Sequence, residues 1–570
     1  MKMKTRKIFA LLLACLLIVS VAACGGNNNG GGSSPGTSSS PGTESSPGTS
    51  SSAGASSSPG TSSSPGTDSS PGTSSTPGDQ GGGAASGKDT VVFTASADPG
   101  TLSPILFGGD YNTACNLMLE SLWHPMADGS IEWILATGVD EVGPKEWIVH
   151  LREGVFFSNG DPFTADDVLF SIALHKEYAS TAGPRVQSVD DAATKKIDDY
   201  TIDLILYDYH VANYLVLSAC NIYNSKTYSA EQASNNPIGT GPYVLSEYVI
   251  NSHLLLTRND DYWGEKPAIK NVMFRVLAES SQIVNALVLG SVDTALVQPA
   301  DYDYISTLPN YTIIDRYSAN WSTLGFSVGK NSIFYQNVEA RYAVAHAVDP
   351  QVVLNIVYEG RGRLMRSQTS RAIPDYQDRF DDMHETYSIG YNVDLARQYA
   401  ESSGIVGKTI RIAINGSMPT MMQTAEIVQN MLGAIGVNAE INTYDAATLW
   451  SLRYDPEAEY DMTCGTSFSA NMLCADGLVN AVRYSPVLSA PGSWVGVERF
   501  MEICDLAFSE PDKQTRDDVT FELMTLHTTA CLSFALVDYP TPRVWSNDID
   551  PDSIVYNVGG ILRLQYLRFK

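Results

Sequence analysis

The sequence contains few cysteines, few basic residues and only a short apolar run at its start. Its 570 residues include 8 cysteines, none spaced as C-x-x-C, and 8 scattered histidines, so zinc binding and haem attachment are not indicated. Lysine and arginine total 36 against 63 acidic residues, giving a formal net charge of −27. This acidity argues against nucleic-acid partners and against a basic membrane-binding face. The apolar run 8–19 falls short of the ~20 residues that a membrane-spanning helix requires.

The N-terminus has the pattern of a signal peptide. Four cationic residues precede the apolar run, and the small residues Val21-Ala22-Ala23 precede Cys24. Val-Ala-Ala-Cys resembles the bacterial lipobox, which implies removal of residues 1–23 and attachment of a diacylglycerol to Cys24. Two acyl chains hold a protein stably at a membrane. We therefore expect a lipoprotein on the extracytoplasmic face of the cell membrane.

Residues 24–88 have the composition of a disordered linker. They are almost wholly Gly, Ser, Pro, Thr and Asn, which cannot bury a core. A flexible chain of roughly 60 residues spans about 45 Å r.m.s., enough to hold a domain clear of the surface. Prolines recur here in six-residue phase, at Pro35, Pro41, Pro47, Pro59, Pro65, Pro71 and Pro77.

The remaining 89–570 is long enough for two or three packed units, and its pattern is mixed α/β without an internal repeat. Thr164, with Asp167 three positions later, predicts a capped helix start. We expect strands over 90–95, 147–152, 254–257 and 438–441, and helices over 280–289, 338–348 and 421–432. The six cysteines of this region allow fifteen complete disulfide pairings, and we expect most of them to be buried thiols.

Several segments resemble one known family. They are LREGVFFSNGDPFTADDVLFSI (151–172), NPIGTGPYVLSEY (236–248), LTRNDDYWGEKPAIKNVMFRV (256–276), ALVLGSVDTA (286–295), ARYAVAHAVDPQVVLNIVYEGRG (340–362), YNVDLARQYAESSGI (391–405) and the strand Tyr460-Asp461-Met462. Together they resemble the bacterial extracellular solute-binding proteins of family 5, the oligopeptide- and dipeptide-binding class that serves ABC importers. Within them, we interpret 239–243 as a glycine turn before a strand, and 260–264 as a loop fixed against a core aromatic.

The resemblance implies a periplasmic-binding-protein-like fold of two lobes, a three-domain cluster of type II with discontinuous domains. The expected first lobe combines 89–125, 236–320 and 536–570, with an inserted subdomain at 126–235, and the expected second lobe is 321–535. A small solute would bind between closing lobes and pass to a membrane permease. No cofactor, metal or catalysis is implied, and the family suggests a monomer.

The expected ligand contacts differ from those of peptide-binding members. Those members hold the peptide's α-amino group with an aspartate in a Gly-Trp-x-x-Asp-like segment, but here the tryptophan position is Ser467 and the aspartate position is Ala470. A buried ammonium without a partner is costly, so a free peptide N-terminus is disfavoured. Asp476 could substitute only if the loop folds back, and 471–474 shows no obvious turn. The pocket residues we predict are Phe107, Asp110, Tyr111, Trp321, Ser467, Phe468 and Asn471. Phe and Trp at such positions are more often core than ligand contacts, and Asp110 could instead cap a helix.

Two other functions fit a secreted α/β protein. A secreted hydrolase is disfavoured, because Ser327-x-x-Lys330 lacks its companion motifs and 404–409 (GIVGKT) lacks the first glycine of a phosphate-binding loop. A receptor that reports its loaded state to a membrane sensor remains open, because sensing and import use the same closing domain.

Overall fold

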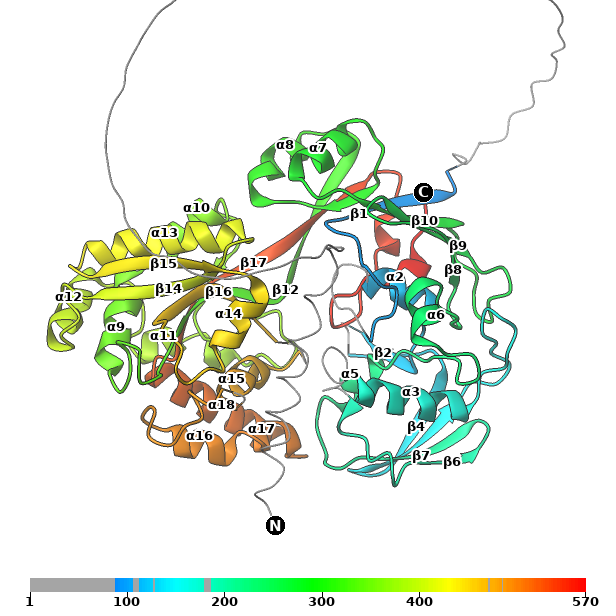
Figure 1. Cartoon of the computed structure of the whole chain (residues 1–570), viewed down its shortest axis with the longest axis horizontal. Coiled ribbons are helices and arrows are strands. Elements are labelled where there is room, and N and C mark those ends of the chain that lie inside the picture. The colour runs from blue at the N-terminus through cyan, green and yellow to red at the C-terminus, as the bar shows by residue number, and fades with distance from the viewer. Residues whose placement is uncertain (1–87, 106–111, 127–128, 179–185, 470–471, 484) are drawn as a thin grey trace, which may run out of the picture. The chain divides into compact units, whose positions relative to one another are not determined.

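The computed structural model describes residues 88–105, 112–126, 129–178, 186–469, 472–483 and 485–570. All of them belong to one compact unit, which is drawn in colour in Figure 1. Cys24, Phe107, Asp110, Tyr111 and Asn471 lie outside the described residues.

An 11-stranded sheet runs through this unit in the order β15-β14-β16-β12-β17-β11-β1-β10-β9-β8, with β13 paired to β17. Its strands are β1 (Thr90–Ala95), β8 (Tyr243–Val249), β9 (His253–Arg258), β10 (Asn271–Val276), β11 (Thr294–Leu296), β12 (Tyr311–Phe326), β13 (Arg363–Leu364), β14 (Thr409–Asn415), β15 (Asn438–Tyr444), β16 (Met462–Phe468) and β17 (Ser533–Ser546). Separate hydrophobic cores form at its two ends. We call the parts around β1 and β8–β11 the first lobe and those around β14–β16 the second lobe.

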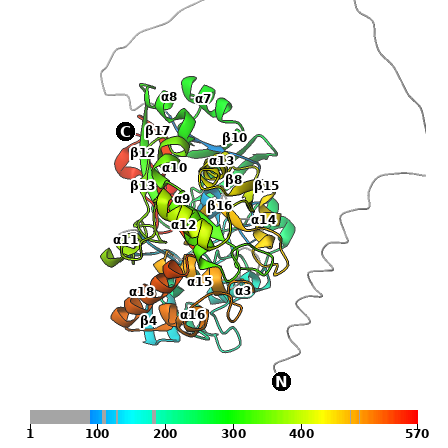
Figure 2. The same ribbon diagram turned by 90° about the vertical axis from the view of Figure 1, so that its left-hand side faces the viewer.

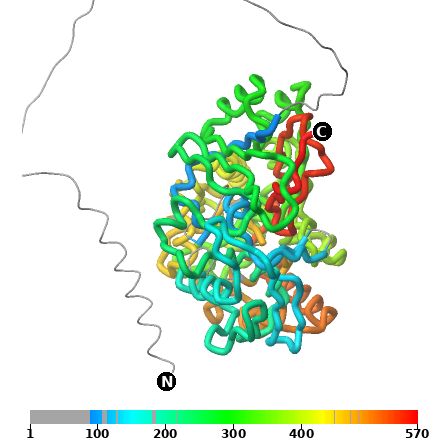
Figure 3. Tube along the Cα trace, turned by 90° about the vertical axis from the view of Figure 1, so that its right-hand side faces the viewer, coloured from blue at the N-terminus to red at the C-terminus, as the bar shows by residue number. Residues whose placement is uncertain are grey.

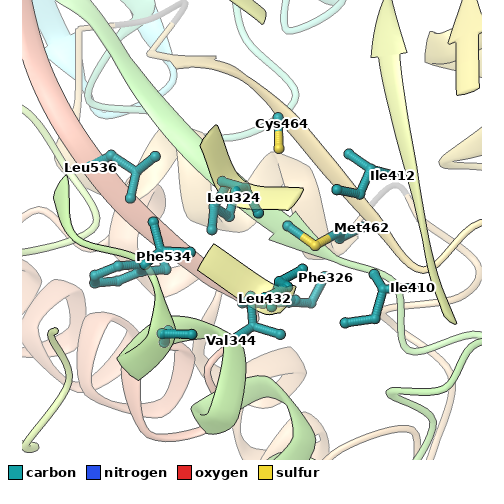
Figure 4. Packing of buried hydrophobic residues seen from close by; sticks show 14 of the residues in the cluster. Leu324, Phe326, Val344, Ile410, Ile412, Leu432, Met462, Cys464, Phe534 and Leu536 are labelled. Carbon is teal, nitrogen blue, oxygen red and sulfur yellow. The ribbon is translucent and has the colours of Figure 1, made fainter. Parts of the chain in front are cut away.

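The second lobe has two apolar cores. The larger packs helices α9, α10, α12 and α13 against β14, β16 and the ends of β12 and β17; Figure 4 shows Leu324, Ile412, Met462 and Phe534 within it. The other core joins α15, α16 and α18, and Figure 2 faces this lobe. The helices are α9 (Val338–Ala347), α10 (Pro350–Val357), α11 (Met383–Thr386), α12 (Val393–Ser402), α13 (Pro419–Gly433), α14 (Ala446–Leu452), α15 (Cys474–Arg483), α16 (Val497–Ile503), α17 (Leu506–Ser509) and α18 (Lys513–Thr529).

The first lobe packs the N-terminal strand against the C-terminal segment, seen side by side in Figure 3. The Lys88 ammonium lies 5.6 Å from the centre of the Phe569 ring. A smaller core under α7 and α8 covers the other face of the sheet. The helices are α2 (Asn112–Met118), α3 (Ala165–Glu177), α5 (Asn213–Ser218), α6 (Ala230–Asn235), α7 (Ser280–Val288) and α8 (Tyr302–Ser306).

A subdomain of the first lobe has its own sheet and core. Its strands, in the order β4-β5-β7-β6, are β4 (Ala136–Gly143), β5 (Glu146–Leu151), β6 (Lys195–Asp198) and β7 (Thr201–Ile205). The two-stranded sheet of β2 (Trp123–Pro125) and β3 (Ile131–Trp133) adjoins it.

The predicted elements are confirmed, with ends shifted by a few residues. The strand over 90–95 is β1, and the strands and helices expected at 147–152, 254–257, 280–289, 338–348, 421–432 and 438–441 are β5, β9, α7, α9, α13 and β15. The Asp167 carboxylate accepts the Thr164 N–H at 2.9 Å, as the predicted cap of α3 requires. The six described cysteines are free and buried.

Within the described residues, no helix combines the length and apolar character needed to cross a bilayer. The same residues contain no cluster of three or more potential metal ligands.

The family-like segments 239–243 and 260–264 meet at a buried carboxylate, and Trp263 also packs against the core that contains Trp123. Thr240 Oγ1, Tyr262 Oη and Trp263 Nε1 donate to the Glu120 carboxylate at 2.9, 2.7 and 3.0 Å. Burial raises the pKa of Glu120 to about 7, although these three donors and Arg563 lower it. The two segments therefore stabilise the first lobe around one acidic group.

This carboxylate predicts a pH dependence of stability. The pKa of Glu120 is about 7 in the folded chain and near 4.3 when unfolded, so the folded state binds the proton more tightly between these values. Its contribution to stability is greatest at or below about pH 4.3 and declines as pH rises to 7. The side chain of Glu120→Gln stays neutral at every pH. The melting temperature of Glu120→Gln should therefore rise relative to that of the wild type as pH increases from 5 to 7.5.

Differential scanning calorimetry across this pH range measures the gap in melting temperature. Glu401→Gln, an exposed change on α12, should follow the wild-type curve. A constant gap between Glu120→Gln and the wild type would contradict a buried titrating carboxylate.

Candidate ligand-binding site

Two long strands pass from one lobe into the other. Residues 311–317 of β12 pair with the part of β17 that also pairs with β11, whereas 320–326 pair with β16 in the second lobe. The β12–β17 register shifts between Tyr317 and Trp321. An irregular pair of connecting strands is suited to the hinge of a closing protein, because a few residues can absorb the change in backbone angles.

A cavity of about 650 Å³ lies where a turn of the first lobe faces a loop of the second. Six of its seven lining residues belong to the second lobe, among them Arg371, Tyr376 and Asp378, and the first lobe contributes Gly129. Arg371 Nε donates to Asp381 Oδ1 at 2.8 Å, and Tyr376 Oη donates to the same oxygen at 2.7 Å. The hydrogen bonds of Arg371 to Asp381 raise the pKa of the guanidinium. The volume is typical of small-molecule sites.

Three of the predicted pocket residues are described, and the structure brings them together. Trp321 pairs with Ser467, and Asn320 with Phe468, at the end of the β12–β16 ladder. Phe468 is 49% exposed, so its ring is available to a ligand. Trp321 is only 2% exposed and packs in the core with α15, so it offers a ligand almost no surface in this conformation.

The described residues on either side of 470–471 are joined by a hydrogen bond. Ser469 Oγ accepts the Leu473 N–H at 2.9 Å, and Met472 adopts a positive φ of 55°. Asp476 lies in the first turn of α15 and is 2% exposed, and its charge acts on His210 of the first lobe. The positive φ falls on Met472, which is neither glycine nor asparagine, so the residue type at this position does not signal it.

The lobes also touch at a second place, between the segment after β7 and α17. The Val211 N–H donates to the Phe508 carbonyl at 2.8 Å. The His210 and Phe508 rings stack with centroids 5.0 Å apart and planes 6° from parallel. His210 Nδ1 accepts the Ala212 N–H at 3.1 Å, so this nitrogen carries no proton.

From the His210–Phe508 contact we expect the closed form of the protein to be less stable in acid. Burial lowers the pKa of His210. The Asp476 carboxylate opposes that shift, and the Arg483 guanidinium adds to it. Arg483 is itself ion-paired to Asp505 at 2.5 Å. When the lobes separate, the exposed imidazole regains a pKa near 6.5, so the closed form loses stability as pH falls below that value. Small-angle scattering of the ligand-free protein should show a larger radius of gyration at pH 5.5 than at 7.5.

Two variants separate the effect of His210 protonation from that of the stacking between the His210 and Phe508 rings. His210→Phe keeps an aromatic ring without a titrating group and should remove the pH dependence of the radius of gyration. Phe508→Ala should expand the protein at both pH values. An identical wild-type radius at pH 5.5 and 7.5 would refute this role of His210.

Sequence reasoning missed several of these residues. Arg371, Tyr376, His210 and Phe508 belong to no local motif, and their roles depend on segments far apart in the chain meeting between the lobes.

Comparison with solved structures identifies the fold. NikA from Brucella suis, in complex with Fe(III)-EDTA, is similar with a TM-score of 0.74 at 18% identity, covering 84% of this chain and 100% of that chain. The fold is the two-lobed α/β fold of periplasmic binding proteins.

Sequence comparison then gives the family. Residues 131–485 match the bacterial extracellular solute-binding proteins, family 5, and the chain belongs to this family. The Di/tripeptide-binding protein 1 of Pseudomonas aeruginosa is 26% identical over 395 residues, which are 62% of this chain and 72% of that protein. The Heme-binding protein A of Haemophilus influenzae is 24% identical over 400 residues, 64% of this chain and 72% of that protein. The family comprises solute-binding proteins of ABC importers, and the role of its members is to bind a solute.

Proposed function

We propose that this protein is the substrate-binding lipoprotein of an ABC importer. It captures a small solute, of the oligopeptide and dipeptide class or a related one, between its lobes and delivers it to a membrane permease. The observation that carries this proposal is the cavity between Gly129 and residues 371–378, in a protein whose lobes are joined by β12 and β17. A ligand that touches both walls stabilises the closed form by its difference in affinity for the two forms.

A thermal-shift screen tests capture. The chain from residue 24, with Cys24→Ser to keep it unlipidated, is melted with peptides, amino-sugar oligomers, opines and nickel chelates. A ligand at a hundredfold excess over its Kd adds about 2.7 kcal/mol of stability, which a melting curve resolves. Scattering should show compaction with the same solute. Turnover of a peptide or ester substrate would overturn the binding role, and a shift with ordinary unblocked dipeptides would contradict the inference from Ala470.

The lipid anchor is part of the proposal. The motif ending at Cys24 and the Gly/Ser/Pro/Thr linker of 24–88 support a tether that keeps the monomeric receptor near its permease. Cell fractionation tests it: the full-length chain should be found with the membrane, and Cys24→Ser should move it to the soluble extracytoplasmic fraction. Retention of Cys24→Ser in the membrane would refute lipidation at this residue.

A further inference from the structure

Arg361 makes a contact between the two lobes that the candidate site does not use. It follows α10 of the second lobe, in the turn before β13, and its guanidinium carbon lies 3.4 Å from the centre of the Tyr302 ring of α8. Arg361 Nη2 is also ion-paired to the Asp303 carboxylate on the same helix. Helix α8 belongs to the first lobe, where Ile305 packs in the core under α7 and α8. We call Arg361, Tyr302 and Asp303 the hinge clasp.

The turn that carries Arg361 is fixed on the second lobe and on β17. The Arg361 N–H donates to the Tyr358 carbonyl at 2.8 Å, and Tyr358 packs in the larger core of the second lobe. Gly362 has a φ of +148°, and a Cβ there would lie 2.8 Å from the Asp538 carbonyl oxygen, so glycine allows the turn to approach the strand. Arg363 then pairs with Asp538 in the β13–β17 ladder. Arg361 therefore moves with the second lobe when the hinge bends.

The other half of the clasp is fixed on the first lobe. Tyr302 Oη donates to Asp315 Oδ2 at 3.2 Å, in the part of β12 that pairs with the first-lobe end of β17. Arg361 Nε is buried and has no hydrogen-bond partner among the described residues. A cation over an aromatic ring is attracted more strongly where water is excluded. The ring contact should therefore contribute more than the ion pair, because the Asp303 side chain is 82% exposed.

Two contacts between the lobes lie on opposite sides of the hinge strands. In Figure 1, α7 and α8 lie above β12 and β17, whereas α5 and α17, next to the His210–Phe508 contact, lie below them. Bending at these strands moves the lobes apart on one side and together on the other. Opening at His210 and Phe508 would therefore press the Arg361 turn against α8. The guanidinium already touches the Tyr302 ring, so the clasp resists that movement.

We propose that Arg361 is a positioning residue, and that the hinge clasp holds the lobes at the angle at which the His210–Phe508 contact and the interlobe cavity form. A contact that is stronger in one conformation shifts the equilibrium toward that conformation by the difference in free energy. The closed form is then favoured before a solute arrives, so a smaller part of the binding free energy is needed to bring the lobes together. Arg361 acts through the hinge and does not touch the solute.

The test measures the distance between the lobes in the absence of solute. The mature chain with Cys24→Ser receives two cysteines for spin labels, Glu146→Cys in β5 of the first lobe and Gln514→Cys in α18 of the second, both at exposed positions. The six described native cysteines are buried, so the labels attach to the introduced ones. Pulsed electron double resonance should show more of the longer, open distance in Arg361→Gln than in the wild type. The ratio of closed to open form should fall by about 3- to 10-fold, as expected for the loss of one cation–π contact and one exposed ion pair.

Asp303→Asn keeps the ring contact and should shift the ratio less than Arg361→Gln does, and the double variant should shift it no further than Arg361→Gln, because both changes act in one contact. Arg397→Gln is the control, since Arg397 pairs with Asp394 within α12, and should match the wild type. Unchanged or shorter distances in Arg361→Gln would overturn the proposal. A lower melting temperature without a change in distance would overturn it too, because Arg361 would then only brace its own turn. If Arg361→Gln does not fold, Asp303→Asn decides by the same measurement.

The effect on affinity rests on the proposed receptor function and is measured separately. Calorimetry uses whichever peptide, amino-sugar oligomer, opine or nickel chelate stabilises the wild type most. The Kd of Arg361→Gln should exceed that of the wild type by the inverse ratio of their closed fractions, as the spin labels measure them. A Kd ratio that departs from this value would overturn the role of Arg361 in capture. If no solute stabilises the wild type, the receptor function fails, and the spin-label distances alone decide whether Arg361 holds the lobes.

Discussion

Gly241→Ala is expected to destabilise the first lobe strongly. A Cβ at 241 would lie 2.2 Å from the Leu117 carbonyl oxygen and 2.8 Å from two backbone carbons at the end of α2. Backbone atoms of a packed helix cannot rotate away as a flexible side chain can, so β8 and α2 would have to separate. The Gly241 N–H bond to the Met118 carbonyl, 3.1 Å long, would be lost with that movement. The expected cost is at least about 3 kcal/mol, the upper range for overpacking.

Urea denaturation monitored by tryptophan fluorescence measures this loss. The matched control is Gly433→Ala, because Gly433 ends α13, is exposed and has no atom within 4 Å of the position that the new methyl carbon would take. That change should be neutral or stabilising by up to about 1 kcal/mol. Wild-type stability of Gly241→Ala would show that the approach of β8 to α2 is looser than the structure indicates.

Asp461→Ala should produce the second large loss, in the second lobe. The carboxylate is 2% exposed and accepts the N–H groups of Ile333 and Arg411 at 2.9 and 2.8 Å, and Arg411 Nε at 3.0 Å. Alanine would leave two backbone donors and a guanidinium without their acceptor. Removing one partner of a buried ion pair costs about 3–5 kcal/mol.

The Arg411 side chain is 26% exposed, so water can replace some of its lost contacts and the loss should fall at the lower end of that range. Asp394→Ala is the control: it breaks the exposed pair with Arg397, 3.1 Å long, on the same lobe and should cost no more than about 1 kcal/mol. Chemical denaturation compares the two variants, and an equal, small effect would contradict a structural role for Asp461.

Local sequence signals predicted the local structure well. The alternating residues of 90–95 form β1, and Thr164 with Asp167 begins α3, because neighbours along the chain supply the interactions. The same local signals placed 239–243 before a strand. They could not reveal Glu120 as the common partner of Thr240, Tyr262 and Trp263, since more than a hundred residues separate the carboxylate from its donors.

The predicted pocket residues that the structure describes do not line the cavity formed by Gly129 and residues 371–378. Ser467 and Phe468 do lie beside Trp321, because the β12–β16 ladder joins them. The burial of Trp321 was decided by α15 packing on its ring. Met472 has a positive φ, a backbone conformation that its residue type does not favour.

The sequence by itself determined the class of the protein, an acidic, two-lobed binding protein of family 5, because several independent segments occur in the order and spacing typical of that family. Only the tertiary structure decided which charges are paired. Arg363 meets Asp538 and Arg411 meets Asp461, whereas Arg316 meets an aromatic ring and a glycine. Pairing depends on long-range packing, because the cost of a charge is set by the water and partners that the whole fold leaves around it.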